Sequence, residues 1–266
     1  LAPGAEVAVE VNPATWSKED FAAARAGGVN RFSVGAQAFD DAALRRLGRI
    51  HDAAQARVAV REALATGADV SVDLIYGLPD GGLHGLLESL REALRLRPHH
   101  LSLYALTLEE RVPLARMAAR GEVALPGEDA CAEQYLAAVD ILADNGYRQY
   151  EVSNFCLPGH HSRHNLAYWR REEYHASLLR YVREISSGNC AVAAWEPLAP
   201  GEEREEEVML GLRTAEGVAA ALLAGGERLL AEMEGLGLLA RRGGRVALTT
   251  RGMLVSNAVI GALLAA

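Results

Sequence analysis

The chain has 266 residues, of which 50% are hydrophobic and 23% are charged, and its formal net charge at pH 7 is -8. This composition excludes a largely disordered chain, and the length predicts one large domain followed by a small one. The negative charge argues against a nucleic-acid interface, which requires clustered Lys and Arg. Because no apolar run approaches the roughly 18 residues that cross a bilayer and no secretory leader is seen, we expect a cytoplasmic protein that is not itself a membrane protein.

The three cysteines, Cys131, Cys156 and Cys190, are too far apart to form a CxxC pair or a zinc knuckle. Unpaired thiols in a reducing compartment are therefore expected. Cys131 lies in a helical pattern, and we expect it in the core because a free Cys behaves as a small hydrophobe.

Short β-branched runs alternate with amphipathic stretches, which predicts an α/β fold of βα units on a parallel sheet. Ser17 and Asp20 have the spacing of a capping box that opens a helix, and Gly27-Gly28 ends it. Leucines at helical spacing from Leu83 to Leu94 predict an apolar face that packs on the sheet. The expected strands are residues 6–11, 31–36, 69–75, 100–104 and 148–152.

The composition changes after about Ser186, where two prolines and a glycine within 197–201 precede the acidic run 202–207. We therefore predict a first domain of residues 1–190 and a second of residues 191–266. In the second, a helix, a hairpin around Gly243-Gly244 and a last helix resemble a winged-helix module. Its arginines could form a DNA-reading wing, but the acidic flank favours an intramolecular cap.

Asp73 is the first candidate for a ligand contact, because it follows the apolar run Val70-Ser71-Val72 and precedes the turn Gly77-Leu78-Pro79. The carboxyl ends of parallel strands line the mouth where ligands bind. The alternative is that Asp73 satisfies backbone donors of its own turn.

Three more polar residues, Glu10, Gln37 and Arg49, are expected near the ends of successive strands. A ligand with an amino-acid group and a ribose would use this set, since a guanidinium pairs with a carboxylate while carboxylates accept from hydroxyl or ammonium groups. Each residue alone could be a solvated loop side chain, but their joint placement favours a binding site.

Four ordered segments, VEVNP (9–13), GVNRFSVGAQAF (28–39), LGRIH (47–51) and DLIYGLP (73–79), resemble the oxygen-independent coproporphyrinogen III oxidase-like branch of the radical S-adenosylmethionine superfamily. The similarity extends through MLGLR (209–213) to the end of the chain. The resemblance implies a partial (β/α) TIM-like barrel that binds S-adenosylmethionine against a [4Fe-4S] cluster. It also implies that the residues matching the S-adenosylmethionine contacts are Glu10, Gln37, Arg49 and Asp73.

The cluster-binding motif of that family, a CxxxCxxC loop after the first strand, does not occur in these 266 residues, and neither does the glycine-rich loop after the second. Cluster ligation needs closely spaced thiolates, so we expect no metal site in this chain. We expect that the cluster-binding part precedes Leu1 in the intact protein and that a second omission falls between Tyr174 and His175. Without the cluster, residues 1–266 alone should be inert in radical chemistry.

A second motif is HNLAYW at 164–169, which we expect on a polar loop. The imidazole of His164 can ligate iron axially, while the rings of Tyr168 and Trp169 can lie against a flat macrocycle. Taken alone, such a pattern more often serves packing and hydrogen bonding. It resembles, however, the signature of the haem chaperone members of the family, whereas the true oxidases have no matching His.

We therefore expect a haem chaperone that binds haem and delivers it to haem proteins at the membrane. The alternative is a radical enzyme that oxidatively decarboxylates the propionates of coproporphyrinogen III. A third possibility is an unrelated phosphate-binding (β/α) enzyme with no dependence on iron. The sequence leaves open the haem acceptor, the oligomeric state and whether S-adenosylmethionine is cleaved.

Overall fold

The computed structural model describes residues 4–109, 112–172, 183–184, 186–188 and 199–266. Its contacts divide the chain into two compact units, Leu1–His161 and Ser162–Ala266. The segment 162–172 thus belongs with the C-terminal unit, whereas the sequence placed it in the first domain. The predicted boundary after residue 190 and the omission expected between Tyr174 and His175 both fall outside the described residues, and so does Cys190.

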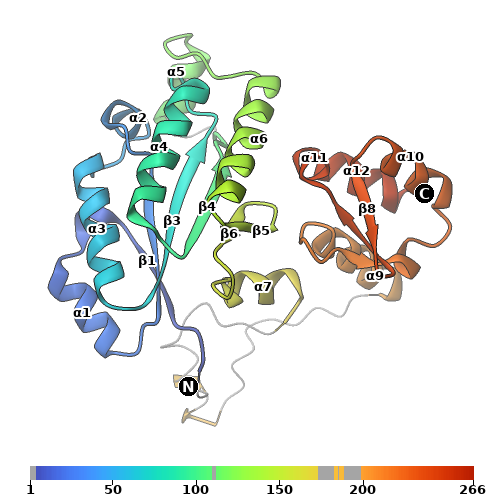
Figure 1. Cartoon of the computed structure of the whole chain (residues 1–266), viewed down its shortest axis with the longest axis horizontal. Helices are drawn as coiled ribbons and strands as arrows, with labels where there is room; N and C mark the ends of the chain where they lie inside the picture. Colours follow the sequence, from blue (N-terminus) through green and yellow to red (C-terminus); the bar gives the residue numbers. More distant parts are fainter. Residues whose placement is uncertain (1–3, 110–111, 173–182, 185, 189–198) are drawn as a thin grey trace. The chain divides into compact units, whose positions relative to one another are not determined.

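A six-stranded sheet with the order β1-β2-β3-β4-β6-β5 forms the N-terminal unit (Figure 1). The first four strands in this order pair in parallel, whereas β6 pairs antiparallel with both β4 and β5. The α/β fold with a parallel sheet is confirmed, and the strand predicted at 148–152 is β5, but its hairpin partner β6 was not predicted. The strands are β1 (Ala8–Val11), β2 (Arg31–Gln37), β3 (Asp69–Tyr76), β4 (His100–Ala105), β5 (Arg148–Glu151) and β6 (Asn154–Cys156).

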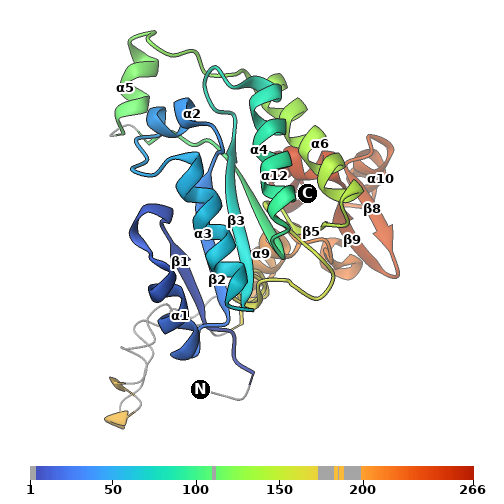
Figure 2. The same ribbon diagram turned by 60° about the vertical axis from the view of Figure 1, so that its left-hand side comes forward.

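Helices α3, α4 and α6 cover one face of this sheet (Figures 1 and 2). The predicted capping box opens α1, where the Ser17 hydroxyl accepts from Asp20 N–H and the Asp20 carboxylate accepts from Ser17 N–H. Leu86 and Leu90 of the predicted apolar face are buried in the core. The helices are α1 (Lys18–Ala26), α2 (Asp41–Arg46), α3 (Ala53–Ala65), α4 (Gly82–Leu96), α5 (Pro113–Ala119) and α6 (Glu128–Asp144), with a 3₁₀ turn at Pro13–Thr15.

The two faces of the sheet differ in chemistry because side chains alternate along each strand. Hydrophobic residues face the helices and are buried, as Val70, Val72 and Leu74 of β3 show. The alternate positions of the same strand hold Ser71 and Asp73. The face opposite the helices, called here the inner face, is therefore polar.

The C-terminal unit combines helices with a three-stranded antiparallel sheet in the order β7-β9-β8. The hairpin predicted around Gly243-Gly244 joins β8 to β9, and both glycines have positive φ. No helix among the described residues is long and apolar enough to span a bilayer. The elements are α7 (Arg163–Trp169), α9 (Pro200–Gly211), β7 (Val218–Ala219), a 3₁₀ turn (Ala220–Leu223), α10 (Glu227–Gly235), β8 (Leu239–Arg242), β9 (Arg245–Leu248), α11 (Thr250–Leu254) and α12 (Ser256–Leu264).

Candidate functional site

Asp73 lies on the inner face, next to serine side chains of neighbouring strands. Its two carboxylate oxygens are 3.1 and 2.9 Å from the hydroxyl of Ser33 on β2, and one of them is 3.3 Å from the hydroxyl of Ser71. Burial raises the pKa of Asp73, and the charge of nearby Glu10 adds to the rise, whereas the serine hydrogen bonds oppose it. Asp73 is the fifth of the eight residues of β3, within the strand that the sequence predicts at 69–75.

Gln37 and Arg49 meet over Gly35, further along β2 than Ser33. The guanidinium of Arg49 donates to the carbonyl oxygen of Gly35 across 3.2 Å. A Cβ atom at Gly35 would stand 2.9 Å from Nε2 of Gln37 and 3.3 Å from Nη2 of Arg49. The absence of a side chain at this position therefore lets an amide and a guanidinium share one small space.

The backbone at the end of β2 helps to bring these groups together. Gln37 has φ of 66°, a left-handed conformation that is uncommon for a residue other than glycine. Arg49 reaches the site from the segment after α2, not from the end of a strand as predicted. Nε of Arg49 is buried and has no hydrogen-bond partner within the described part of the chain, so a donor is available to a ligand.

Glu10, the fourth predicted residue, lies on β1 in register with Ser33 of β2. It is exposed, and its charge acts on Asp73. The structure thus brings the four residues together in two pairs on the inner face, Glu10 with Asp73 and Gln37 with Arg49. That they contact S-adenosylmethionine stays a prediction, and their donors and acceptors fit its amino-acid and ribose groups.

Sequence reasoning missed the serines around Asp73. Ser33, Ser71 and Ser102 occupy the inner-face positions of three adjacent strands, and Ser102 is in register with Asp73. The signal was present as an alternation of serine with buried hydrophobic residues. Serines that recur at every second residue place their hydroxyls on one face of the sheet. Such a pattern is typical of a sheet face that forms a polar site.

The described cysteines do not provide a site for an iron-sulfur cluster. Cys131 lies half-buried on α6, which corrects its expected place in the core, and Cys156 is fully buried on β6. Burial raises the pKa of the Cys156 thiol to about 11, so the thiolate that a metal needs is disfavoured. The residues present therefore do not fit the cluster.

A cluster of two histidines and an acid lies near the amino-terminal ends of β3 and β4. Nδ1 of His160 is 2.8 Å from the carboxylate of Asp69, and the rings of His160 and His99 stack with centroids 4.6 Å apart. These groups could suit a transition metal. However, Nδ1 of His99 accepts from Val70 N–H across 3.1 Å, so in the neutral ring the proton is on Nε2 and no lone pair is left for a metal.

Arg31 gives this cluster its structural role. It is 4% exposed, and its guanidinium lies 2.8 Å from the carboxylate of Glu6 and 3.1 Å from that of Asp69. It also donates to the carbonyl oxygens of His160 and His161, which directly precede the second unit. The cluster is an ion-pair network that fixes the end of the first unit.

His164, Tyr168 and Trp169 lie on α7, so the polar loop predicted for this motif is wrong. The hydroxyl of Ser162 caps the helix by accepting from Asn165 N–H. His164 and Tyr168 are one turn apart and both exposed, so they share a face of the helix.

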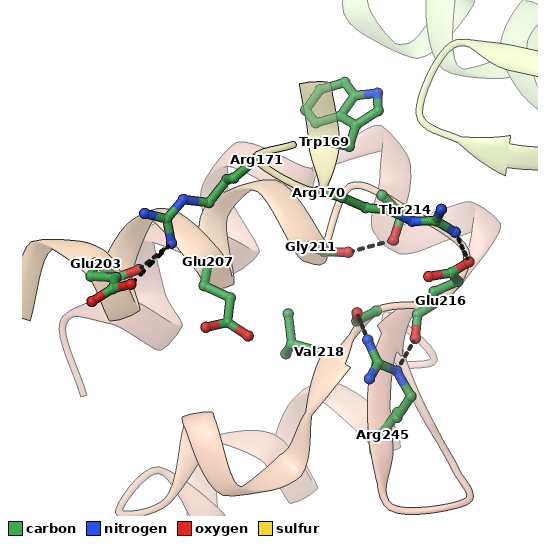
Figure 3. Close-up of a pocket in the computed structure, with 11 residues that line it drawn as sticks. Trp169, Arg170, Arg171, Glu203, Glu207, Gly211, Thr214, Glu216, Val218 and Arg245 are labelled. Atoms are coloured by element: carbon green, nitrogen blue, oxygen red, sulfur yellow. Dashed lines mark hydrogen bonds and ion pairs between the residues drawn. The ribbon is translucent and has the colours of Figure 1, made fainter. Parts of the chain in front are cut away.

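Trp169 points to a different side of α7, because successive residues are about 100° apart around a helix. It lines a hollow of about 500 Å³ in the C-terminal unit, together with residues of α9 and β9 (Figure 3). Two salt bridges next to it tie the end of α7 to this unit, Arg170 to Glu216 and Arg171 to Glu206, at 2.5 and 2.7 Å. The rings of Tyr168 and Trp169 nevertheless pack edge to face with centroids 6.3 Å apart, so Trp169 borders the face that His164 and Tyr168 share.

Comparison with known proteins connects both units to one family. Residues 1–93 match the radical SAM superfamily, and residues 198–255 match the HemN C-terminal domain. The solved structure of coproporphyrinogen III oxidase (HemN) from Escherichia coli, described as a radical SAM enzyme, superposes with a TM-score of 0.70 over 97% of this chain and 69% of that chain. The identity is 19%, so this similarity concerns the fold alone, and it confirms the predicted radical SAM barrel fold.

Sequence relatives are more specific. The chain is 36% identical to the protein named heme chaperone HemW from Mycobacterium tuberculosis, across 99% of this chain and 73% of that protein. It is 31% identical to heme chaperone HemW from Bacillus subtilis, across 97% of this chain and 76% of that protein. The predicted resemblance to the haem chaperone branch is confirmed, and the chain belongs to the HemW family of the radical SAM superfamily.

Proposed function

We propose that this protein is a haem chaperone, which binds haem on the exposed face of α7 and passes it to haem proteins. The observation that carries the proposal is the placement of His164 and Tyr168 one turn apart on that face, in a chain that belongs to the HemW family. A neutral imidazole supplies an axial nitrogen for iron, and a neighbouring phenol ring can lie against the porphyrin.

The geometry of α7 supports different roles for the three predicted haem residues. His164 would ligate the iron, and Tyr168, which is 53% exposed, would contact the macrocycle. Trp169 would hold α7 against the C-terminal unit, since it lines the hollow beside the two salt bridges of Arg170 and Arg171 (Figure 3).

The charge of the inner face argues against the alternative, oxidation of coproporphyrinogen III. That substrate carries four carboxylates, and a site for it would need several cations. The inner face instead presents Glu10 and Asp73, and Glu151 is close enough for its charge to act on Tyr104 of the same face. Of the two guanidiniums described there, Arg31 is engaged by two carboxylates, which leaves Arg49 alone to pair with a ligand carboxylate, too few cations for a substrate with four carboxylates.

The inner face supports a second part of the proposal, that Glu10, Gln37, Arg49 and Asp73 bind S-adenosylmethionine in the intact protein. The guanidinium of Arg49 and the amide of Gln37 would contact the amino-acid carboxylate. The carboxylates of Glu10 and Asp73 would accept from hydroxyl and ammonium groups. The [4Fe-4S] cluster that the family implies would need thiolates from outside these 266 residues.

A haem titration of the 266-residue chain tests the proposal. We expect a saturable shift of the Soret band that is lost in His164→Ala and weakened in Tyr168→Ala. His84→Ala is the matched control, because His84 is also an exposed histidine on a helix, α4, and is not part of this motif. Binding that survives in His164→Ala, or that is lost equally in His84→Ala, would contradict the assignment.

The enzyme alternative needs its own assay. Formation of protoporphyrinogen from coproporphyrinogen III under anaerobic, reducing conditions by the intact protein would favour the oxidase. We expect no turnover, because the inner face offers too few cations to bind a tetracarboxylate ligand.

A further inference from the structure

A chain of hydrogen bonds on the inner face links Asp73 to a tyrosine of β5. The hydroxyl of Ser71 lies 3.3 Å from the carboxylate of Asp73 and 2.7 Å from Nδ1 of His100 on β4. Nε2 of the same imidazole lies 2.8 Å from the hydroxyl of Tyr150 on β5. The chain therefore runs Tyr150, His100, Ser71, Asp73 and joins residues of three strands.

The ionised carboxylate sets one direction for the whole chain. A carboxylate only accepts hydrogen bonds, so the Ser71 hydroxyl must donate to it. Ser71 then accepts from His100, which requires the proton on Nδ1. The other ring nitrogen is left as an acceptor, and the Tyr150 hydroxyl donates to it.

Burial makes this direction hard to reverse. Ser71, His100 and Tyr150 are 3%, 1% and 5% exposed, so water does not compete for their hydrogen bonds. Burial also lowers the pKa of His100 to about 3, which keeps the ring neutral, as a neutral donor–acceptor relay requires. Ser33 and Ser71, which donate to Asp73, both lie on strands of the sheet. The Asp73 carboxylate has further lone pairs that can accept from a ligand.

We propose that Ser71, His100 and Tyr150 are positioning residues, which hold the Asp73 carboxylate as an oriented acceptor for the hydroxyl or ammonium groups of S-adenosylmethionine. The inference rests on the proposed role of Asp73 and goes beyond it, since none of the three residues would touch the ligand. It makes a specific statement about His100: while Asp73 is ionised, the ring carries its proton on Nδ1.

The first test is the tautomer of His100, read from its ¹⁵N shifts by NMR in the chain without ligand. The ionisation of Asp73 is followed in the same sample from its ¹³C carboxyl shift. We expect the Nδ1–H form wherever Asp73 is ionised. We also expect a mixed or Nε2–H form in Tyr150→Phe, because the donor to Nε2 has then been removed.

The second test is the binding of S-adenosylmethionine by the intact protein, measured by equilibrium dialysis. Tyr150→Phe and His100→Asn are expected to weaken binding about tenfold, the effect of disturbing one hydrogen bond to a charged group. Tyr147→Phe is the matched control, because Tyr147 is also a buried tyrosine with one hydrogen bond, to the carbonyl oxygen of Pro98, outside the relay. Thermal unfolding of each variant shows whether a loss of binding reflects a loss of fold.

The outcomes separate this inference from the proposed function. An Nε2–H ring in the wild type with Asp73 ionised would overturn the relay, whatever the ligand affinity. An Nδ1–H ring with unchanged affinity in folded Tyr150→Phe and His100→Asn would overturn the positioning role alone. An Nδ1–H ring in a wild type that does not bind S-adenosylmethionine would instead overturn the ligand site, and the positioning role with it.

Discussion

Gly35→Ala is the substitution that best separates ligand binding from folding. The backbone of Gly35 does not have a positive φ, so alanine adopts it without strain. The added methyl carbon would stand 2.9 Å from Nε2 of Gln37, whereas ordinary contact begins at about 3.4 Å. The amide must therefore move by about 0.5 Å, and the guanidinium of Arg49, at 3.3 Å, by less.

The expected magnitudes follow from these contacts. Both neighbours are the tips of flexible side chains, so the free energy of unfolding should change by less than about 1 kcal/mol, close to the gain of a typical Gly to Ala change. Losing one charge-assisted contact to S-adenosylmethionine costs about 1.5–3 kcal/mol, so we expect about ten- to a hundredfold weaker binding.

Equilibrium dialysis with S-adenosylmethionine and denaturation in guanidinium chloride measure the two effects in Gly35→Ala. Gly85→Ala on α4 is the matched control, since no atom lies within 4 Å of the Cβ position there. A folded Gly35→Ala protein that binds S-adenosylmethionine as tightly as the wild type would refute the proposal that the groups over Gly35 contact the ligand.

Four further changes test the rest of the structure. Arg31→Ala should lower the free energy of unfolding by about 3–5 kcal/mol, because two carboxylates lose their buried partner, and a change below about 1 kcal/mol in denaturation would contradict this role. The pKa of His100 is about 3 in the folded state, whereas its ordinary value is 6.5, so the unfolded chain takes up a proton first as the pH falls. The free energy of unfolding should therefore drop by about 4–5 kcal/mol between pH 6.5 and pH 3. Denaturation of His100→Asn should not show this part of the pH dependence. Gly217→Ala should prevent stable folding of the C-terminal unit, since its Cβ atom would lie 2.0 Å from a backbone oxygen of β9 and its φ is +62°, and a wild-type melting temperature would refute this. Alkylation of the native protein, mapped by mass spectrometry, should modify Cys131 and spare Cys156, whose thiol is buried with a pKa of about 11; equal modification would be the contrary result.

Much of the fold was predictable because its signals are local. The first four predicted strands coincide with β1 to β4 to within two residues at each end, since each is a β-branched run bounded by turn residues. The hairpin after Arg148 was not predictable in the same way, because β6 is three residues long and its pairing with β4 is a long-range contact. The helix at 163–169 was missed because its cap, Ser162, follows a polar stretch with three histidines nearby rather than an apolar run.

The candidate site was predictable as a set of residues but not as a geometry. Residue types and family motifs pointed to Glu10, Gln37, Arg49 and Asp73. The register between β2 and β3 decides that Ser33 contacts Asp73. This register depends on pairing between segments 38 residues apart in the sequence. The role of His100 depends on several strands at once and has no signal in a single segment.

The anchoring of His160 and His161 by Arg31 determines where the chain departs from the sheet. Arg31 begins β2 and Gln37 ends it, so these two residues mark opposite ends of a strand of seven residues, about 20 Å apart. The chain thus leaves the sheet near the start of β2, whereas Gln37 and Arg49 meet near its end. A ligand held by Gln37 and Arg49 would therefore lie a full strand length away from the point at which the chain leaves the first unit.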